Sequence, residues 1–488
     1  MVYLICVIAY LILLGGIAVW KSGAVKNQSD FAVAGRSLSP WMMVCTMLAV
    51  WIGTGSIVGN AEQTYESGMA ALLLPTGTLF GMILLSLIAS RARNVEASTV
   101  PEIIERRFGP VARSLAMVSL VIAYMVIVSY QFNAGGAVLE VIVGDKAILT
   151  AGQATMIAAA FIICYAALAG LMSLASMDLV TGSIIMLTML IAFPIYWFKA
   201  GGWSGIEAGF ITDQRPEHLN LWGVYSPTQM INYILPVFLL VLGDANQYQR
   251  IFASRSAKGA RSAVTMMVFI AFAVELLIIG CAWVASSMTP DPESGKYILI
   301  YAARHYLWRP LGCLFMVTVV AIIISTATSF LHVPATSVVN DLYLPYINPK
   351  ASQTRIVWIS RLLVVVFGVV AYIVTFMFSE STGFFRKALY AFTIYGACVT
   401  PSLVAALLWP RATKQGAISS IISGAVVTLA WNEIDLIRKS LPTALADLDA
   451  VLPAITVSVL MLVSVSFMTR PENRSSESNE QPTKESVE

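Results

Sequence analysis

Four hydroxyl-bearing residues, which we call the hydroxyl row, lie close together in an otherwise apolar stretch: Ser325, Thr326, Thr328 and Ser329. On a helix, Ile322, Ser325, Thr326 and Ser329 are three and four residues apart and share one face. Hydroxyl oxygens gathered in this way can coordinate a small hard cation. They can equally bond back to the carbonyl one turn earlier or join two helices.

Three acidic residues lie inside apolar segments and are further candidates for a site: Asp178, Asp244 and Glu275. A charged acid at membrane depth costs at least about 2.5 kcal/mol and normally faces a partner or a water-filled cavity. Asp178 could join the hydroxyl row in a cation cage. Asp244 could face a cationic group of a solute, or it could cap the half-helix that follows it, ANQYQRIF. Glu275 has no evident partner in the sequence.

Aromatic and amide side chains accompany these groups. Trp51 can stack on a solute or bind an ammonium group by a cation–π contact, although tryptophan in such a position also packs against lipid or protein. Tyr124, Tyr130, Gln131 and Asn133 are polar at depth and could be ligands or could link helices. The six cysteines have no metal-ligand spacing and the three histidines form no catalytic pattern, which argues against an intramembrane enzyme.

The composition indicates which elements position these groups. Of the 488 residues, 58% are hydrophobic and 12% are charged, whereas a soluble domain carries about 25% charged residues. A net charge of +3 provides no basic surface for nucleic acid. These values exclude a soluble enzyme, a disordered chain and a nucleic-acid-binding protein. The long apolar runs predict an all-α polytopic membrane protein.

A membrane span needs about 20 mostly apolar residues. Thirteen segments qualify: 2–20, 41–60, 70–91, 112–142, 147–169, 173–198, 228–251, 260–287, 310–335, 355–378, 386–409, 415–431 and 450–468. The first lacks a basic stretch before it and a cleavage site after it, so we expect a retained span rather than a signal peptide.

Basic residues gather on one side of these spans, which predicts a cytoplasmic C-terminus and an external N-terminus in a plasma membrane, most simply a bacterial inner membrane. That side receives 20 of the 30 Lys and Arg residues: Lys21, Lys26, Arg36, Arg91, Arg93, Arg106, Arg107, Arg113, Arg250, Arg255, Lys258, Arg261, Lys350, Arg355, Arg361, Arg411, Lys414, Arg470, Arg474 and Lys484. We expect residues 470–488 to be a disordered cytoplasmic tail.

Two of the predicted spans contain breaks. The second reads MLAVWIGTGSIVGNAEQTY, with Gly53 and Gly55 at mid-depth, and the seventh reads ILPVFLLVLGDANQYQR, with Pro236, Gly243 and Asp244. Non-helical backbone at membrane depth is tolerated where it lines a cavity or is buried. Two interruptions five spans apart are typical of an inverted-repeat transporter and point to its binding site, although glycines also serve close helix packing.

Three blocks in the chain, AGRSLSPW, MDLVTG and STATS followed by NDLY, resemble the sodium:solute symporter family over about residues 1–430. The resemblance implies a leucine-transporter-type 5+5 inverted repeat with an extra N-terminal helix. It implies one transporter domain over 1–469, with a first repeat at 41–198, a second at 228–409 and accessory helices at 410–469.

The resemblance also implies two ion sites and a solute site. The family's shared sodium site corresponds to Ala49, Ile52, Ile322, Ser325 and Thr326. A second sodium site, found in some members, corresponds to Asp178, Ser325, Thr328 and Ser329. The stretch around Trp51 is similar to the choline branch, although the other aromatic positions of that branch's cage do not match. The candidate solute-binding residues are Trp51, Gly53, Ser56, Gln131, Asp244, Gln247 and Tyr248.

The sequence and the resemblance together predict a sodium-coupled symporter that works by alternating access. We expect Na⁺ as the coupling ion, no cofactor and a small solute that is cationic or zwitterionic, such as an amino acid or a choline-like compound. The bilayer is an expected partner, nucleic acid is not, and we expect the chain to function as a monomer. The alternative is a sensor with the same fold that binds without transport, which the short polar tail disfavours.

Overall fold

The computed structural model describes residues 2–22, 28–143, 150–168, 170–291, 295–377, 383–434, 442 and 447–470. Within these ranges every regular element is a helix. Leu38 and Ser254 form one isolated bridge. The predicted disordered tail, 470–488, lies outside the described residues apart from Arg470.

The helices of the first half are α1 (Val2–Ser22), α2 (Gln28–Val33), η1 (Ala34–Arg36), α3 (Pro40–Trp51), η2 (Gly55–Asn60), α4 (Ala61–Ser67), η3 (Gly68–Leu73), α5 (Thr76–Asn94), α6 (Val100–Phe108), α7 (Pro110–Val143), α8 (Ala151–Leu168), α9 (Leu171–Lys199), α10 (Gly202–Thr212) and η4 (Pro216–Leu219). Those of the second half are α11 (Pro227–Gly243), α12 (Ala245–Ala253), α13 (Ala257–Ser286), α15 (Ile298–His305), α16 (Arg309–Val338), η5 (Val339–Ile347), α17 (Gln353–Val374), η6 (Thr375–Met377), α18 (Phe384–Leu408), α19 (Lys414–Glu433) and α22 (Val451–Met468).

The predicted number of 13 spans is not confirmed. Among the described residues, nine helices are long and apolar enough to cross a membrane, or ten if the bent pair of α3 and η2–η3 is one span. The predicted spans 2–20, 70–91 and 415–431 are helical as α1, α5 and α19 but fall outside this set. They are shorter in their apolar part, or carry more polar and charged residues, than the segments that qualify.

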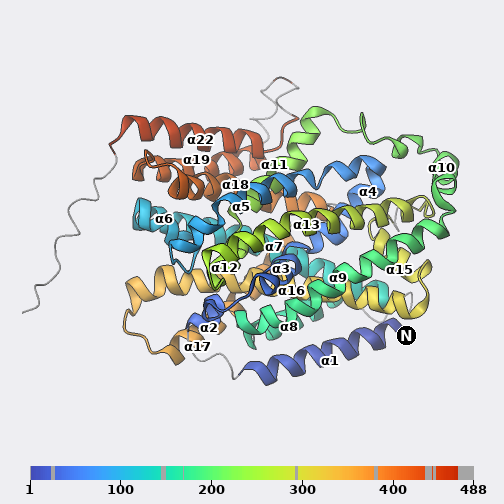
Figure 1. Ribbon diagram of the computed structural model, residues 1–488, viewed down its shortest axis with the longest axis horizontal. Helices are drawn as coiled ribbons and strands as arrows, with labels where there is room; N and C mark the ends of the chain where they lie inside the picture. The colour runs from blue at the N-terminus through green and yellow to red at the C-terminus, as the bar shows by residue number, and fades with distance from the viewer. Residues whose placement is uncertain are drawn as a thin grey trace, which may run out of the picture.

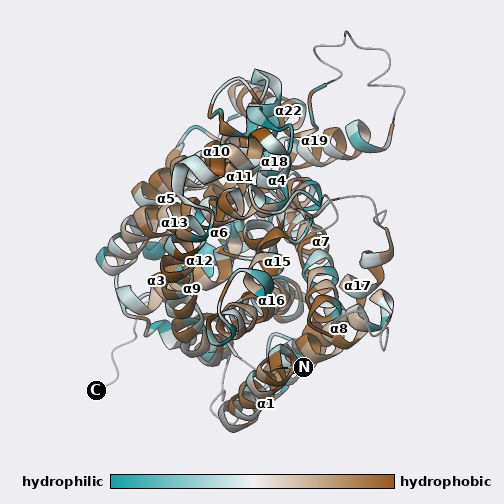
Figure 2. Cartoon of the chain, turned by 90° about the vertical axis from the view of Figure 1, so that its right-hand side faces the viewer, coloured by the Kyte–Doolittle hydropathy of each residue, from teal (hydrophilic) through white to brown (hydrophobic). Residues whose placement is uncertain are grey.

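The helices run side by side, with α1 at one edge of the bundle and α19 and α22 at the opposite edge (Figure 1). Helix α10 lies at the other end of the bundle from α6, which carries basic residues predicted to be cytoplasmic. Figure 2 looks from one end and shows hydrophobic residues along most helices, including α1 and α8 at the periphery.

The centre of the bundle is occupied by the helices that are most deeply buried. Within an apolar stretch of 18 residues, 83% of the residues are buried inside the protein in α16 with η5, and 72% in α18. The buried fraction falls to 33% in α17 with η6 and to 28% in α22. Because a helix that is hydrophobic all round is buried by protein or by lipid, this difference separates the central helices from those that face the bilayer.

Both broken helices begin with residues that favour the start of a helix. Pro40 starts α3, and the Ser39 hydroxyl at its N-cap accepts a hydrogen bond from the Met42 amide. Helix α11 starts with a capping box in which Ser226 and Gln229 satisfy each other's backbone amides. Such caps fix where a helix begins, and they therefore also fix the depth at which each helix reaches its break.

Candidate functional site

The first break separates α3 from η2. Ile52, the C-cap of α3, has φ −75° and ψ 89°, and the two parts of the helix are bent by 57°. The amide and hydroxyl of Thr54 both donate to Oε1 of Gln131 on α7, the amide at 3.4 Å. A Cβ on Gly53 would lie 2.9 Å from Cγ2 of Thr326 and 3.0 Å from Nε2 of Gln131. The absence of a side chain at Gly53 therefore allows the break to approach α16 and α7 closely.

The hydroxyl row meets the first break at the Ala49 carbonyl. The Ser325 and Thr326 hydroxyls each lie 3.4 Å from this oxygen, and both residues are buried. Ile52 and Ile322 are buried as well and flank the junction along α3 and α16. The structure thus brings together three residues of the predicted first sodium site, with the other two one turn away or less in the chain.

Asp178 on α9 lies beside this junction. Its carboxylate accepts a hydrogen bond from the Ser325 hydroxyl at 2.5 Å and one from the Thr46 hydroxyl at 2.6 Å. Thr46 was not predicted as a site residue, although it lies one turn before Ala49 on α3 and shares its face. Carbonyl, hydroxyl and carboxylate oxygens converge here, and such donors suit a hard cation better than a transition metal.

The predicted second sodium site contains a guanidinium. Arg250 of α12 is fully buried, and its Nη2 lies 2.9 Å from the Ser329 hydroxyl and 3.8 Å from Oδ2 of Asp178. The Thr328 hydroxyl has no hydrogen-bond partner among the described residues. Arg250 was expected in a basic cytoplasmic loop, and this expectation is wrong: α12 follows the second break and directs the side chain into the bundle.

At the second break, between α11 and α12, the chain supplies its own helix cap. Asp244 is the N-cap of α12: its carboxylate accepts from the Asn246 amide at 3.1 Å and from the Tyr124 hydroxyl of α7 at 2.5 Å. The Tyr248 hydroxyl donates to the Leu242 carbonyl at 3.3 Å. The arrangement favours the capping interpretation of Asp244 over direct contact with a solute.

Four of the predicted solute-binding residues are buried at these two breaks. Gln247 and Tyr248 are fully buried, and Nε2 of Gln247 lies 3.5 Å from the Met47 carbonyl of α3. Gln131 holds Thr54, as described above. Ser56 is buried in η2. The contact of Gln247 with Met47 links the second break to the first, so in this conformation these side chains contact protein groups.

Trp51 is half-buried at the end of α3, and its indole Nε1 donates to Oε1 of Glu275 on α13 at 2.8 Å. Both residues stood out in the sequence, but no spacing rule joins positions 224 residues apart. Only the packing of α13 against α3 brings them together.

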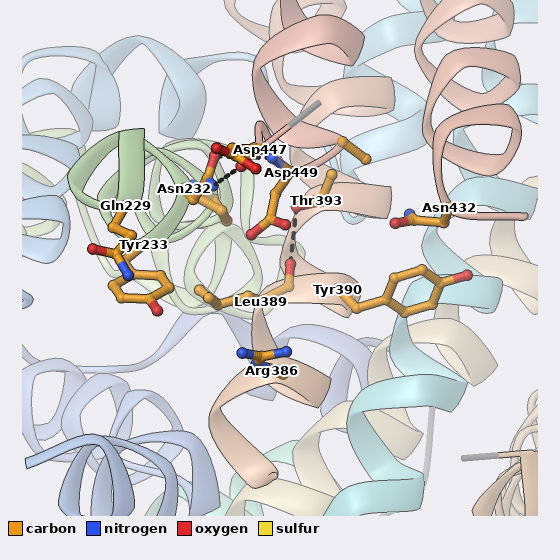
Figure 3. Close-up of a pocket in the computed structure, with 12 residues that line it drawn as sticks. Gln229, Asn232, Tyr233, Arg386, Leu389, Tyr390, Thr393, Asn432, Asp447 and Asp449 are labelled. Carbon is orange, nitrogen blue, oxygen red and sulfur yellow. Dashed lines mark hydrogen bonds between the residues drawn. The ribbon is translucent and has the colours of Figure 1, made fainter. Parts of the chain in front are cut away.

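A polar cavity of about 380 Å³ opens elsewhere, between α11, α18 and the segment before α22. Asn232 spans part of it, donating to the Asp447 carbonyl and accepting from the Asp449 amide, both at 3.0 Å (Figure 3). Its lining on α11 ends at Pro236, about 10 Å along the helix from the break at Gly243. None of the predicted site residues lines it.

Comparison with known proteins supplies a family for this geometry. The model of the sodium:solute symporter family matches residues 31–424. A high-affinity proline transporter, PutP, of Bacillus subtilis is 25% identical over 467 residues, which cover 91% of this chain and 93% of the relative. The sodium/glucose cotransporter of Vibrio parahaemolyticus is 23% identical over 510 residues, covering 94% of this chain and 89% of the relative.

Among solved structures, the substrate-bound, outward-open state of a Na⁺-coupled sialic acid symporter superposes with a TM-score of 0.80. It covers 96% of this chain and 98% of its own, at 14% sequence identity. At that identity the likeness establishes the fold alone: an all-helical transporter fold of the leucine-transporter type.

Proposed function

Since this chain belongs to the sodium:solute symporter family, we propose that it moves one sodium ion together with one zwitterionic, amino-acid-like solute per cycle. The family places it among multi-pass membrane transporters coupled to sodium and not among enzymes. The ion site, the ion count and the solute class are our proposal.

The proposed ion site is the junction of the hydroxyl row with the first break. The observation that carries it is the approach of the Ser325 and Thr326 hydroxyls to the Ala49 carbonyl, 3.4 Å in each case. A sodium ion between them would replace two long oxygen–oxygen contacts with shorter ion–oxygen contacts. The carbonyls of Ile52 and Ile322 are the further ligands we propose, because both residues adjoin this point.

The ion count follows from Arg250. A second sodium ion bound by Asp178, Thr328 and Ser329 would have to displace the guanidinium, which already neutralises Asp178 and bonds to Ser329. Two cations in one buried space repel each other strongly at low dielectric. We therefore propose that the Arg250 guanidinium occupies the predicted second site. One sodium ion then moves in each transport cycle.

The solute class rests on the groups at the two breaks. Trp51 offers an aromatic face, and Glu275, Gln131 and Asp244 each have one oxygen that already accepts a hydrogen bond within the protein. Such a wall suits a small solute whose own charges balance. Relatives named for proline, which is a zwitterion, are compatible with this choice, whereas a relative named for glucose shows that the same fold also carries an uncharged solute.

Coupling follows from the position of the ion between two moving parts. Sodium bound at the junction would hold the broken α3–η2 helix against α16 and so complete the chamber beside Trp51. Ion and solute then stabilise each other's binding by the same factor, because linkage is reciprocal. Release of sodium to the cytoplasm frees the two parts to separate, and we propose that the two breaks begin two inverted repeats that rock against each other.

The test is uptake by purified protein in proteoliposomes, with labelled proline, glucose and choline as probes. We expect proline-type uptake that requires an inward sodium gradient and is lost when potassium replaces sodium. Ser325→Ala should abolish it, while Ser337→Ala, a buried hydroxyl on the same helix about 18 Å further along, should not. Equal uptake in sodium and potassium would overturn the proposal.

A further inference from the structure

Glu275 is a buried acid at membrane depth that neither the ion site nor the second break uses. It lies in the middle of α13, is 3% exposed and forms no ion pair among the described residues. Its Oε1 accepts the indole hydrogen bond of Trp51, and the Thr78 hydroxyl of α5 lies beside it. Its Oε2 is buried and has no hydrogen-bond partner in the described part of the chain.

Burying an acid at membrane depth costs free energy, so a functional role for Glu275 is the default hypothesis. Direct binding of the solute does not account for it in this state, because one carboxylate oxygen is bonded to Trp51 and the other is buried. The carboxyl group therefore acts on the proposed solute site beside the first break through the indole that it holds.

Trp51 is the residue whose orientation depends on this hydrogen bond. It is the last residue of α3, it is half-buried, and its own carbonyl accepts from the Gly53 amide at 2.9 Å across the break. Beyond it the helix restarts without a side-chain cap. At an uncapped, glycine-rich junction the local backbone does little to fix the indole, so a hydrogen bond from outside the helix determines which way the ring faces.

We propose that Glu275 is a positioning residue that sets solute affinity by orienting the Trp51 indole at the edge of the chamber. The carboxyl group acts as a hydrogen-bond acceptor and not as a charge for a cationic solute. The effect on affinity rests on the proposed binding of solute at the first break, whereas the effect on the indole does not.

The experiment compares Glu275→Gln, Glu275→Leu and Trp51→Phe. Glutamine keeps an acceptor oxygen at the same place, leucine removes it, and phenylalanine removes the donor. Thr188→Val is the matched control, because it deletes a buried hydroxyl pair with Thr318, 3.3 Å long, on helices α9 and α16. Two readouts are needed: KM and maximal rate of sodium-driven proline uptake, and the emission spectrum of Trp51 obtained by subtracting that of the Trp51→Phe protein.

We expect Glu275→Leu to raise KM about tenfold, the equivalent of one buried hydrogen bond, with the maximal rate nearly unchanged. Trp51→Phe should raise KM to a similar extent, and the double variant should be no worse than either single variant. Glu275→Gln and Thr188→Val should keep KM within a factor of about three. The Trp51 emission should shift in Glu275→Leu and remain in place in Glu275→Gln.

Two results would overturn the inference. One is an unchanged Trp51 emission in Glu275→Leu, which can be observed even without transport. The other is a Glu275→Gln variant as impaired as Glu275→Leu, which would mean that the charge matters and not the acceptor. Failure of the wild-type protein to take up solute in a sodium gradient would count against the proposed function instead, and the emission result would still decide the role of Glu275.

Discussion

The two broken helices of the bundle differ in how the backbone groups at the break are capped and bonded. At the first break, no side chain caps the restart at η2, and the Ala49 carbonyl faces the Ser325 and Thr326 hydroxyls of another helix. At the second break, Asp244 caps α12 within the same segment, and the Tyr248 hydroxyl returns to the carbonyl before the break.

This difference indicates where an ion can bind. A break whose restart is capped by its own side chain has its first free amide satisfied without an ion. A break whose restart is uncapped, and whose carbonyl faces hydroxyls of another helix, offers oxygens that a shared ion could bind. Sequence interruptions therefore locate two breaks, and the capping pattern is what distinguishes the proposed ion site from the second break.

The largest expected effect comes from the residue that connects the two breaks. Asp178 accepts from Ser325 at the first break and pairs with Arg250, which the second broken helix supplies. Asp178→Asn leaves a buried guanidinium without its counter-charge, and losing one partner of such a pair costs about 3–5 kcal/mol. We expect a strong fall in thermal stability of the detergent-solubilised protein and loss of the stabilisation that sodium provides.

Replacing both charges is the control for Asp178→Asn. The double variant Asp178→Asn, Arg250→Gln removes the uncompensated charge, so it should regain much of the thermal stability without regaining sodium-dependent uptake. A single Asp178→Asn variant that is as stable as the natural chain would show that the pair does not link the two breaks.

A smaller effect is expected from adding one methyl group at the first break. In Gly53→Ala, the new Cβ would press against Thr326 Cγ2, 2.9 Å away, and push a proposed sodium ligand aside. Overpacking of this kind costs about 1–3 kcal/mol, so the sodium concentration for half-maximal uptake should rise about tenfold. Gly152→Ala, where a Cβ meets nothing within 4 Å, is the matched control, and an equal response from both would contradict the tight junction.

The smallest effects are expected at the second break. Tyr124→Phe removes one donor to Asp244 and should cost about 1 kcal/mol of stability, with unchanged sodium dependence. Asp244→Asn should leave solute KM unchanged, because asparagine caps a helix about as well as aspartate. A KM that rises at least tenfold in Asp244→Asn, measured by uptake, would instead place the carboxylate against a cationic group of the solute.

Part of the proposed ion site depends on local rules. Helical spacing puts Ser325 and Ser329 on one face, and glycines at mid-depth indicate the break near Ala49. The structure places Ser325 beside both Asp178 and the Ala49 carbonyl. The family resemblance carried the remaining step, which was to match one span with another far away in the chain.

The parts that could not be predicted depend on how the helices turn and pack. Arg250 was counted with the cytoplasmic basic residues because it lies at the end of the predicted span 228–251, and only the direction of α12 after Asp244 buries it. Glu275 and Trp51 were singled out separately, since no periodicity relates residues on helices that pack through tertiary contact alone. Gln247 and Tyr248 looked like solute ligands, whereas here they bond to backbone carbonyls.

The buried Asp178–Arg250 pair also bears on how membrane voltage drives the cycle. A full crossing of one charge is worth about 2.3 kcal/mol per 100 mV, so a lone acid carried by a moving helix would make the return of the empty protein depend on voltage. Because the buried guanidinium offsets the charge of the acid, we expect the return of the empty protein to be nearly independent of voltage. On the proposed ion site, the voltage dependence would then belong to the step in which the sodium ion moves.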